Sequence, residues 1–424
     1  MKRRTFLKNS AAVAVSSIAP SRVLGANNRV VIGIMGVRGR GRSLTQNFAA
    51  LSDVEIAYLC DVDHNVIGRA VKSLEEVNHK KPKIVGDFRR ILEDSDVDAL
   101  VVAAPDHWHA LATIYACQAG KDVYVEKPIS HNIREGRLMV QAARKYKRVV
   151  QVGTQNRSRD TVQVGIEFAH SGKLGRVLMA KAWNSQRRDN IGHQADGIVP
   201  LGVDYDMWLG PAPKRPFNKN RFHYNWHWFW DYGTGDMGND GIHQLDIARW
   251  ALQEDYPESV VCSGAKLFFD DDQQTPDTQV AAFKFRDKML TFEMRIWSPY
   301  KMEGAANGVA VYGSEGYMIL TDKWRGWMVY GNDDQPGYLL KATDQTDAPH
   351  YRNFIECVRS RRQPICDIET GHFSTILIHA GNIAMRLGRR LEFDARTESF
   401  VGDREANRYL SREYRKPWEL TDKV

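Results

Sequence analysis

The stretch that decides the fold reads Arg29-Val30-Val31-Ile32-Gly33-Ile34-Met35, followed by Gly36-Val37-Arg38-Gly39-Arg40-Gly41. The first part is apolar and β-branched, which is typical of a strand buried on both faces. The second part is a glycine-rich turn, and residues 43–51 after it have the apolar spacing of a helix. A strand, a glycine turn and a helix in this order predict the first unit of a parallel α/β sheet.

The same alternation continues to about residue 152. We expect further strands at 54–59, 84, 98–103, 123–125 and 149–152. Helices are expected between them: one after the second strand that ends at about residue 77, and others at 87–92, 110–119 and 133–146. Strands that alternate with helices predict right-handed crossovers and therefore a doubly wound parallel sheet of the Rossmann type.

The pattern changes after residue 151. Runs with strand character lie at 177–183, 260–269, 278–285, 289–297, 308–312, 316–321 and 327–330, and helices are expected at 160–170, 237–252, 351–359 and 373–387. Strands at this spacing predict a large, mostly antiparallel open sheet. We therefore expect an α/β chain with a Rossmann domain at 27–150, a second α/β domain at 151–395 and a tail at 396–424.

The first 26 residues predict an export signal. Arg3 and Arg4 stand in a basic start, and a mild apolar run covers residues 11–19. That run is about half of the ~20 residues that span a bilayer, which favours export over stable membrane insertion. The paired arginines indicate the twin-arginine route and a periplasmic or secreted protein. The alternatives are a disordered basic start and a lipoprotein signal, and the second lacks a cysteine near residue 25.

Charge and cysteine usage exclude some classes of partner. The formal net charge is +7, but the basic residues of the signal leave only +2 on the remainder, whereas nucleic-acid binding needs a concentrated basic face. The cysteines show no Cys-x-x-Cys spacing, so we expect buried apolar residues. A Cys357–Cys366 disulfide is the alternative for one pair.

The glycine turn and the strand after it predict a dinucleotide site. The backbone of Gly36, Val37, Arg38, Gly39, Arg40 and Gly41, with the helix dipole, would hold a pyrophosphate. Arg38 stands where a glycine usually lets the backbone approach, so it either flanks the phosphates or alters the turn. Asp61 follows the second strand, where a carboxylate accepts from ribose hydroxyls and repels a 2′-phosphate. We expect NAD as the cofactor, with NADP as the alternative.

A lysine follows the strand at 123–125, in the triplet Glu126-Lys127-Pro128. Ligands of open α/β sheets bind at the carboxyl ends of the strands, so the Lys127 ammonium can hydrogen-bond a substrate hydroxyl. A surface lysine is the plainer interpretation of the triplet alone.

A polar loop is expected after the strand at 98–103, with the sequence Pro105-Asp106-His107-Trp108-His109. The alternating His107 and His109 have no third ligand nearby, so they predict no metal site. Cofactor contact, substrate contact and plain loop structure are all open for these histidines.

The helix expected at 237–252 begins with polar residues. Asn239, Asp240 and His243 are spaced to share one helix face. A histidine that a carboxylate or amide orients can take a hydroxyl proton near neutral pH. A capped helix start with a structural histidine is the alternative.

Residues 184–236 lack clear periodicity and include Trp226-His227-Trp228-Phe229-Trp230. Aromatic rings can stack on the C–H faces of a sugar. A packed core or a subunit contact explains the same residues equally well.

Taken in order, these residues resemble the Gfo/Idh/MocA family, which includes glucose–fructose oxidoreductase and inositol dehydrogenase. The resemblance covers nearly the whole chain after the signal. It rests on the Gly36 turn, Asp61, the Pro105-to-His109 segment, Glu126-Lys127-Pro128, Gly153-Thr154-Gln155-Asn156-Arg157 and the helix with His243. The closing Ala406-Asn407-Arg408 and Tyr414-Arg415-Lys416-Pro417-Trp418 are similar to a subgroup of secreted members.

The resemblance implies a tightly held NAD or NADP, sugar or polyol oxidoreduction, and Lys127 and His243 as the catalytic pair. In one departure, the aspartate that the family often has four residues before the histidine is Asn239 here, with Asp240 next to it. We expect Pro105, His109 and Glu126 at the cofactor and Arg157, His227 and Trp230 at the substrate. We also expect a homo-oligomer.

We therefore predict an exported NAD(P)-dependent oxidoreductase that acts on a sugar, sugar derivative or polyol by hydride transfer. His243 takes the hydroxyl proton, and Lys127 steadies the charge on the reacting oxygen. Two alternatives are open. One is an NAD-dependent glycosidase or lyase that works through a transient keto-sugar, and the other is a non-catalytic sugar-binding protein on the same fold.

Overall fold

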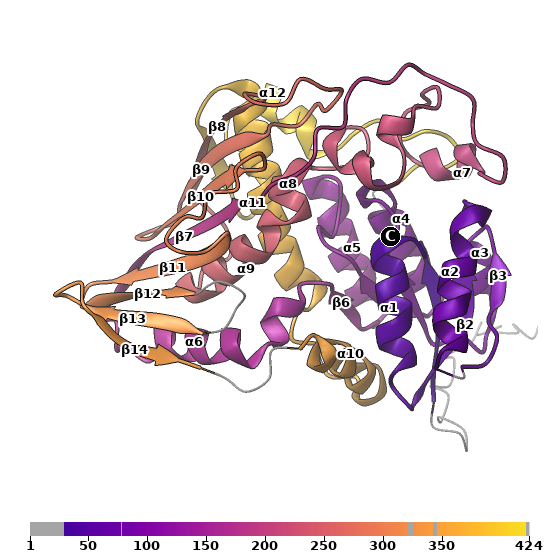
Figure 1. Ribbon diagram of the computed structural model, residues 1–424, viewed down its shortest axis with the longest axis horizontal. Helices are drawn as coiled ribbons and strands as arrows, with labels where there is room; N and C mark the ends of the chain where they lie inside the picture. The colour runs from indigo at the N-terminus through magenta and orange to yellow at the C-terminus, as the bar shows by residue number, and fades with distance from the viewer. Residues whose placement is uncertain (1–28, 78, 321–325, 342–345, 421–423) are drawn as a thin grey trace, which may run out of the picture.

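The computed structural model describes residues 29–77, 79–320, 326–341, 346–420 and 424. Within these residues the strands form two sheets that lie side by side, each with helices packed on it (Figure 1). The signal predicted at residues 1–26 lies outside the described residues.

The first sheet has the strand order β3-β2-β1-β4-β5-β6, and all its neighbours are parallel. Its strands are β1 (Val30–Met35), β2 (Val54–Cys60), β3 (Lys83–Val85), β4 (Ala99–Val102), β5 (Asp122–Val125) and β6 (Val150–Val152). The predicted doubly wound parallel sheet is confirmed. The strand order reverses between β1 and β4, which is the point where such sheets bind ligands.

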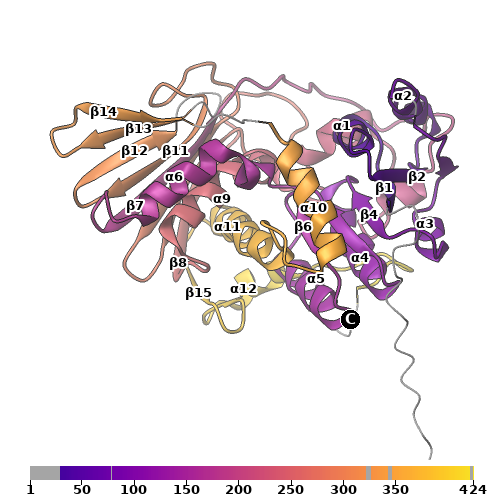
Figure 2. The ribbon, with the colours of Figure 1, turned by 90° about the horizontal axis from the view of Figure 1, so that it is seen from below.

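Helices cover both faces of this sheet (Figure 2). One face carries α1 (Gly39–Ala49), α2 (His64–Glu75) and the late helix α10 (Ala348–Ser360), and the other carries α3 (Arg89–Glu93), α4 (Asp106–Gln118) and α5 (Ile133–Lys145). The sequence of β1 is apolar throughout because both of its faces are covered. Ile32 and Ile34 pack against the helices α1, α2 and α10, and Val31 and Met35 face the helices α3, α4 and α5.

The glycine turn has a conformation that requires glycine. Gly36 has a φ of +82°, and a Cβ there would lie 2.7 Å from the carbonyl oxygen of Ala103. Helix α1 begins within the turn, at Gly39, and not at residue 43 as predicted. The low helix propensity of glycine concealed this first turn in the sequence.

Helix α4 also begins earlier than predicted, at Asp106, so His107 and His109 lie on a helix and the predicted loop is wrong. Pro105 occupies the N-cap position and Asp106 lies in the first turn. A proline at the start and a carboxylate near the positive end of the helix dipole both favour a helix start at this point.

The second sheet has the strand order β14-β13-β12-β11-β7-β10-β9-β8-β15-β16. Its strands are β7 (Val177–Ser185), β8 (Ser259–Ala265), β9 (Thr278–Lys284), β10 (Met289–Arg295), β11 (Asn307–Gly313), β12 (Gly316–Leu320), β13 (Trp327–Gly331), β14 (Pro336–Leu340), β15 (Leu391–Asp394) and β16 (Ser399–Phe400). β7 and β10 are parallel and the other pairs are antiparallel, so the predicted mostly antiparallel sheet is confirmed. Three short strands were not predicted: β14 at one edge of the sheet contains Pro336 and Gly337, β15 contains two acidic residues, and β16 at the other edge has only two residues.

One face of the second sheet packs against α6 (Asp160–His170), α9 (Gly241–Leu252) and α11 (Ile368–Leu387) around a single apolar core. The helix predicted at 237–252 is two helices, because α8 (Gly235–Asn239) ends at Asp240, whose φ of −120° is not helical. Gly238 and Gly241 on either side of the break weaken a continuous helix.

The segment predicted as a tail at 396–424 is packed against both domains. β16 joins the second sheet, α12 (Arg404–Asn407) follows it, and Trp418 then contacts Trp108 of α4 with ring centroids 4.9 Å apart. In the described part of the chain, no helix is long and apolar enough to span a membrane.

A long segment between β7 and α8 covers the carboxyl ends of the first sheet (Figure 1). This aromatic cover (residues 203–232) contains α7 (Tyr205–Leu209) and 3₁₀ turns at Lys219–Arg221 and His223–Trp228. Its aromatic side chains, among them Trp208, Phe222 and Tyr232, form a small core of their own. The amide of Asp204 donates to the Val62 carbonyl at 2.8 Å. The cover is therefore a packed element that is fixed to the first domain.

Candidate active site

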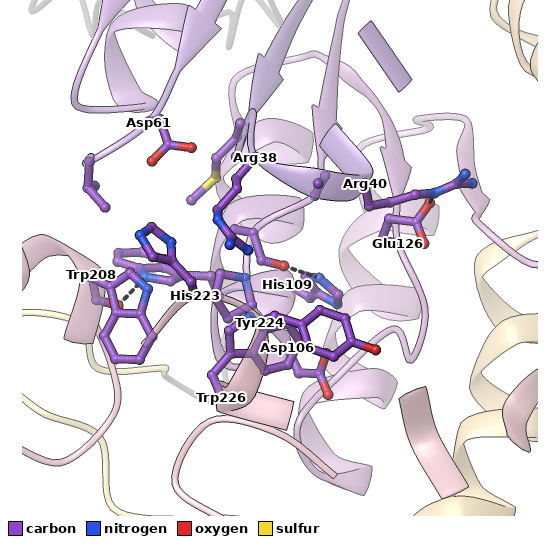
Figure 3. Close-up of a pocket in the computed structure, with 18 of the residues that line it drawn as sticks. Arg38, Arg40, Asp61, Asp106, His109, Glu126, Trp208, His223, Tyr224 and Trp226 are labelled. Atoms are coloured by element: carbon purple, nitrogen blue, oxygen red, sulfur yellow. Dashed lines mark hydrogen bonds and ion pairs between the residues drawn. The ribbon is translucent and has the colours of Figure 1, made fainter. Parts of the chain in front are cut away.

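A cavity of about 430 Å³ lies between the carboxyl ends of the first sheet and the aromatic cover (Figure 3). Met35, Cys60, Ala103 and Glu126 line it from the ends of β1, β2, β4 and β5, and Tyr224 lines it from the cover. This volume is typical of a site for a small molecule or cofactor.

The glycine turn forms one wall of the cavity. The residues of the turn that line it are Gly36, Arg38, Gly39 and Arg40, and Figure 3 shows the Arg38 side chain projecting into the space. Val37 and Gly41 stand behind this wall, where a Cβ on Gly41 would lie 1.7 Å from the carbonyl oxygen of Gly36. No side chain caps α1, so the positive end of its dipole faces the cavity and fits a pyrophosphate.

Asp61 lines the cavity just beyond the end of β2. Its Oδ2 accepts from the N–H of Val37 at 2.8 Å, and its Oδ1 accepts from the N–H of Asp63 at 3.0 Å. Burial raises the pKa of Asp61, and these two hydrogen bonds oppose the rise. The carboxylate is held rigidly at the wall, in a position that fits ribose hydroxyls.

The cover is joined to the first domain around the cavity. His223 Nε2 lies 3.0 Å from Asp63 Oδ2 at the end next to Asp61, and Trp108 donates its indole N–H to the carbonyl of Trp208 at 3.1 Å. Burial lowers the pKa of His223, with Arg38 adding to the effect. The pair with Asp63 is thus a hydrogen bond of a neutral imidazole near neutral pH.

Lys127 and His243 reach the same cavity from different domains. The Lys127 ammonium donates to the carbonyl oxygen of Asn239 at 2.5 Å, and His243 lies in the first turn of α9. His243 Nδ1 is buried and has no hydrogen-bond partner among the described residues. Burial lowers the pKa of His243 well below its ordinary value, and the charge of Lys127 lowers it further. A neutral imidazole beside an ammonium can accept a proton while the ammonium donates a hydrogen bond.

Asn239 and Asp240 do not share a face with His243 as predicted, because the helix breaks at Asp240. Asn239 lines the cavity, and its side-chain amide donates to Asp236 at 2.9 Å. The Asp240 carboxylate turns to the second sheet, where it accepts from Gln186 at 2.5 Å and Asn307 at 2.8 Å. Burial and the neighbouring Asp236 raise the pKa of Asp240. Neither side chain orients the His243 imidazole.

Glu126, Pro105 and His109 all line the cavity as predicted for cofactor contacts. The Glu126 carboxylate pairs with the Arg40 guanidinium at 2.7 Å, which keeps the pKa of Glu126 low despite burial (Figure 3). His109 lies between the carbonyl oxygens of Pro128 at 2.7 Å and Ala104 at 2.8 Å. It therefore holds the loops after β4 and β5 together.

The aromatic run 226–230 divides between the cavity and the packed interior. Trp226 and His227 line the cavity, and burial lowers the pKa of His227 to about 3. Trp230 is not among the lining residues, and Arg386 lies over its ring at 4.9 Å. The prediction of Trp230 as a substrate contact is wrong for this geometry, because the chain turns away from the cavity after the 3₁₀ turn.

Arg157 is also placed away from the cavity. Its guanidinium forms two hydrogen bonds with the Asp246 carboxylate, at 2.7 and 2.9 Å, and lies 4.5 Å from the ring of Trp250. The predicted substrate contact is therefore an ion pair between α9 and the 3₁₀ turn at Gln155–Ser158, which follows β6. Gln155, two residues earlier, is the side chain of this segment that reaches the cavity.

Several lining residues were not predicted as site residues: Asp63, Phe88, Asp106, Trp208, Phe222, His223 and Tyr224. Four of them (Trp208, Phe222, His223 and Tyr224) belong to the aromatic cover, whose position depends on tertiary packing that periodicity does not reveal. Asp106 carried a usable signal, since it precedes His107 directly after a strand end. In the ranges that the structure describes, no three His, Cys, Asp or Glu side chains gather as a metal site, and all five cysteines are free thiols.

Two family models match most of the chain. The model of the oxidoreductase family, NAD-binding Rossmann fold (GFO_IDH_MocA), matches residues 28–154. The model of the oxidoreductase family, C-terminal alpha/beta domain (GFO_IDH_MocA_C2), matches residues 182–297 and 330–420. The first domain is therefore an NAD-binding Rossmann domain, and its cofactor is NAD.

Among curated proteins, the chain is similar to glycosyl hydrolase family 109 protein 1 of Shewanella sp. (strain ANA-3), with 28% identity over 207 residues. The match covers 42% of this chain and 45% of that protein, so it spans less than half of the relative. A glycosyl hydrolase family 109 protein of Stenotrophomonas maltophilia is 35% identical over 133 residues, which are 30% of this chain and 29% of that protein.

Solved dehydrogenases share the fold. The WlbA dehydrogenase of Bordetella pertussis, in complex with NADH and UDP-GlcNAcA, superposes with a TM-score of 0.66 at 22% identity over 86% of this chain and 99% of that one. Levoglucosan dehydrogenase, in complex with NADH and levoglucosan, superposes with a TM-score of 0.69 at 15% identity, again over 86% of this chain and 99% of that one.

Proposed function

The chain belongs to the GFO/IDH/MocA oxidoreductase family, and on that premise we propose that it is an exported enzyme that oxidises or reduces a sugar, a sugar derivative or a polyol by hydride transfer. The observation that supports this most is the meeting of Lys127 and His243 at the cavity that the glycine turn lines. Domain packing has no general reason to bring a lysine and a neutral histidine to one wall of a nucleotide cavity.

The first domain holds the cofactor. The start of α1 would hold the pyrophosphate, and Asp61 would accept hydrogen bonds from the adenosine ribose. When bound, NAD supplies the acceptor and donor of the hydride. The fixed Asp61 carboxylate supports NAD over NADP, because it would repel a 2′-phosphate.

The second domain supplies the base. His243 is neutral near pH 7, and its Nδ1 has no partner within the described part of the chain, so it can take the proton of a substrate hydroxyl. The Lys127 ammonium leaves the Asn239 carbonyl and donates to the reacting oxygen, where negative charge develops. Tyr224, Trp226 and His227 from the cover provide aromatic surface for the sugar.

A second candidate is an NAD-dependent glycosidase that works through a transient keto-sugar. It is supported by the likeness to proteins named glycosyl hydrolase family 109. The cover supports it as well, since the His223–Asp63 and Trp108–Trp208 contacts oppose exchange of the cofactor after each turnover. A retained cofactor suits a reaction that returns the hydride to the same sugar.

A panel of free sugars, polyols and p-nitrophenyl glycosides, given to the NAD-loaded protein, distinguishes the candidates. An oxidoreductase accumulates reduced nicotinamide, seen by its near-ultraviolet absorbance. The glycosidase releases p-nitrophenol without net reduction. Binding of a panel sugar with neither signal would show a non-catalytic binding protein instead, a role that the presence of both Lys127 and His243 argues against.

We also propose a homo-oligomer. The face of the second sheet opposite α9 and α11 exposes Val261, Val280 and Met289, which alternate with the buried residues of β8, β9 and β10. Such an apolar sheet face is suited to a second copy of the chain. Light scattering of the purified protein tests this, and a monomeric mass would reject it.

A further inference from the structure

A buried carboxyl group that has no role so far lies at the cavity. Asp106 opens α4 directly after β4, lines the cavity and is only 1% exposed. Its Oδ2 accepts from the Thr234 hydroxyl at 3.2 Å, but its Oδ1 is buried and has no partner among the described residues. An unsatisfied oxygen in the interior is costly, so its presence calls for a physical explanation.

The charges around Asp106 single out Lys127. Burial raises the pKa of Asp106 well above its ordinary range, Lys127 opposes this rise, and Glu135 of α5 adds to it. His107 and His109 on the same helix are kept neutral, because burial lowers the pKa of both. Lys127 is therefore the neighbouring charge that favours the ionised form of the Asp106 carboxyl against burial.

Asp106 and Lys127 also contact the two ends of the same short helix. Thr234, which donates to Asp106, is the N-cap residue of α8. Asn239, whose carbonyl accepts from Lys127, is the last residue of α8. If Lys127 turns from that carbonyl toward a reacting oxygen, its ammonium loses one acceptor, and Asp106 Oδ1 is available to replace it.

We propose that Asp106 is a positioning residue for Lys127: it fixes α8 through Thr234 and offers Oδ1 to the ammonium when that ammonium turns to the substrate. The role in turnover rests on the proposed function. The mutual dependence of the two side chains is independent of the proposed function, because it follows from the burial of a carboxyl beside a cation.

A double-mutant cycle in thermal unfolding of the NAD-loaded protein tests that dependence without a substrate. Lys127→Met leaves the Asp106 carboxyl without its counter-charge and should lower the Tm. Asp106→Asn keeps the side-chain shape and an acceptor for Thr234, so adding it to Lys127→Met should recover at least half of the lost Tm. A double variant that melts at or below Lys127→Met overturns the proposal.

The kcat of the variants distinguishes a positioning role from a merely structural one, because a merely structural role would leave kcat unchanged. With the panel sugar that reacts fastest, Asp106→Asn should lower kcat about tenfold while NAD binding stays unchanged, and it should cost nothing further in the Lys127→Met background. Equal fractional losses in both backgrounds would contradict the inference. A wild-type protein inactive on the whole panel would contradict the proposed function instead, and the unfolding cycle would still decide whether Asp106 depends on Lys127.

Asp122 provides a matched control. It is another buried carboxylate of the first domain, at the start of β5, and it pairs with Arg361 at 2.5 Å. Asp122→Asn should lower the Tm, leave kcat unchanged and show the same loss with and without Lys127→Met. Coupling of Asp122 to Lys127 as strong as that of Asp106 would overturn the assignment, because it would reflect general destabilisation.

Discussion

The Nζ of Lys127 lies 2.5 Å from the carbonyl oxygen of Asn239, so the ammonium at the end of β5 is bound to the last residue of α8, the short helix that precedes α9 and His243. This contact joins the two domains at the catalytic cavity. It also gives the ammonium a defined resting partner, from which the oxygen of a bound sugar would displace it under the proposed function. The site is thus preorganised before the substrate enters.

Loss of either member of this pair should stop turnover without releasing the cofactor. For Lys127→Ala and His243→Ala we expect a fall in kcat of roughly 10²–10⁴-fold, as for a positioned acid–base group. NAD content, measured after denaturation, should stay at the wild-type level, because the proposed pyrophosphate and ribose contacts are in the glycine turn and at Asp61. Lys145→Ala on the exposed end of α5 is the control. Normal kcat in His243→Ala would exclude His243 as the base.

The pH dependence of kcat/KM should extend to unusually low pH. The base form of His243 is the neutral imidazole, and burial lowers the pKa of this group well below its ordinary value near 6.5. A lowered pKa means that the neutral form is lost only when the pH falls through that lower value, so activity should persist below pH 6.5. The bound nicotinamide cation would lower the pKa further. An acidic limb with its midpoint at or above 6.5 would contradict a buried neutral His243.

Cofactor preference should depend on Asp61. Asp61→Asn keeps the side-chain shape and the acceptor for the Val37 N–H but removes the charge. We expect NAD affinity to fall about tenfold, because a hydrogen bond to a charged group contributes roughly 1.5–3 kcal/mol. NADP binding should improve relative to NAD. Calorimetric titration measures both, with Asp94→Asn in the same domain as the control. Tighter NADP than NAD binding by the wild type would overturn the preference.

The parts of this protein that sequence predicts are those that local physics determines. β1 and the Gly36 turn could be predicted because a short apolar run between turn residues favours a buried strand, and a tight turn with a positive φ favours glycine. Lys127 was also accessible, since it follows a short apolar strand, and His243 was accessible because it lies near the start of a predicted helix, although α9 begins at Gly241 and not at residue 237. The cavity between them lies where the strand order reverses, as the doubly wound topology dictates.

The parts that failed depend on tertiary contacts. Arg157 follows β6 much as Lys127 follows β5, yet its side chain turns to Asp246, 89 residues away. The break at Asp240 separates it from the face of His243, although the spacing predicted a shared face. The aromatic cover has no periodicity because its rings pack on one another. No local pattern distinguishes its cavity-lining Tyr224 from its buried Tyr232.

Export should depend on Arg3 and Arg4, which lie outside the described residues. Replacing both with lysine keeps the positive charge but removes the guanidinium groups, which differ from ammonium in geometry and hydrogen bonding. We expect the double variant to accumulate in the cytoplasm, measured by fractionation and immunoblotting. Arg22→Lys in the same segment is the control and should be exported. Undiminished export of the double variant would reject the twin-arginine assignment.

Substitution of Arg157 should affect stability and not substrate affinity. The Arg157 side chain is 5% exposed, and its loss leaves the buried Asp246 carboxylate without its principal counter-charge. We expect Arg157→Ala to cost about 3 kcal/mol of unfolding free energy, at the lower end of the values for broken buried pairs, because Ser374 and Arg249 still contact Asp246.

The KM of the fraction that folds should match the wild type, since Arg157 does not line the cavity. Denaturant titration and steady-state kinetics on the same preparations measure the two quantities. Gln155→Ala, which alters the lining residue of the same segment, should show the opposite pattern, with a raised KM and nearly unchanged stability. A raised KM in Arg157→Ala with wild-type stability would restore Arg157 as a substrate contact and show that the buried pair with Asp246 opens when the sugar binds.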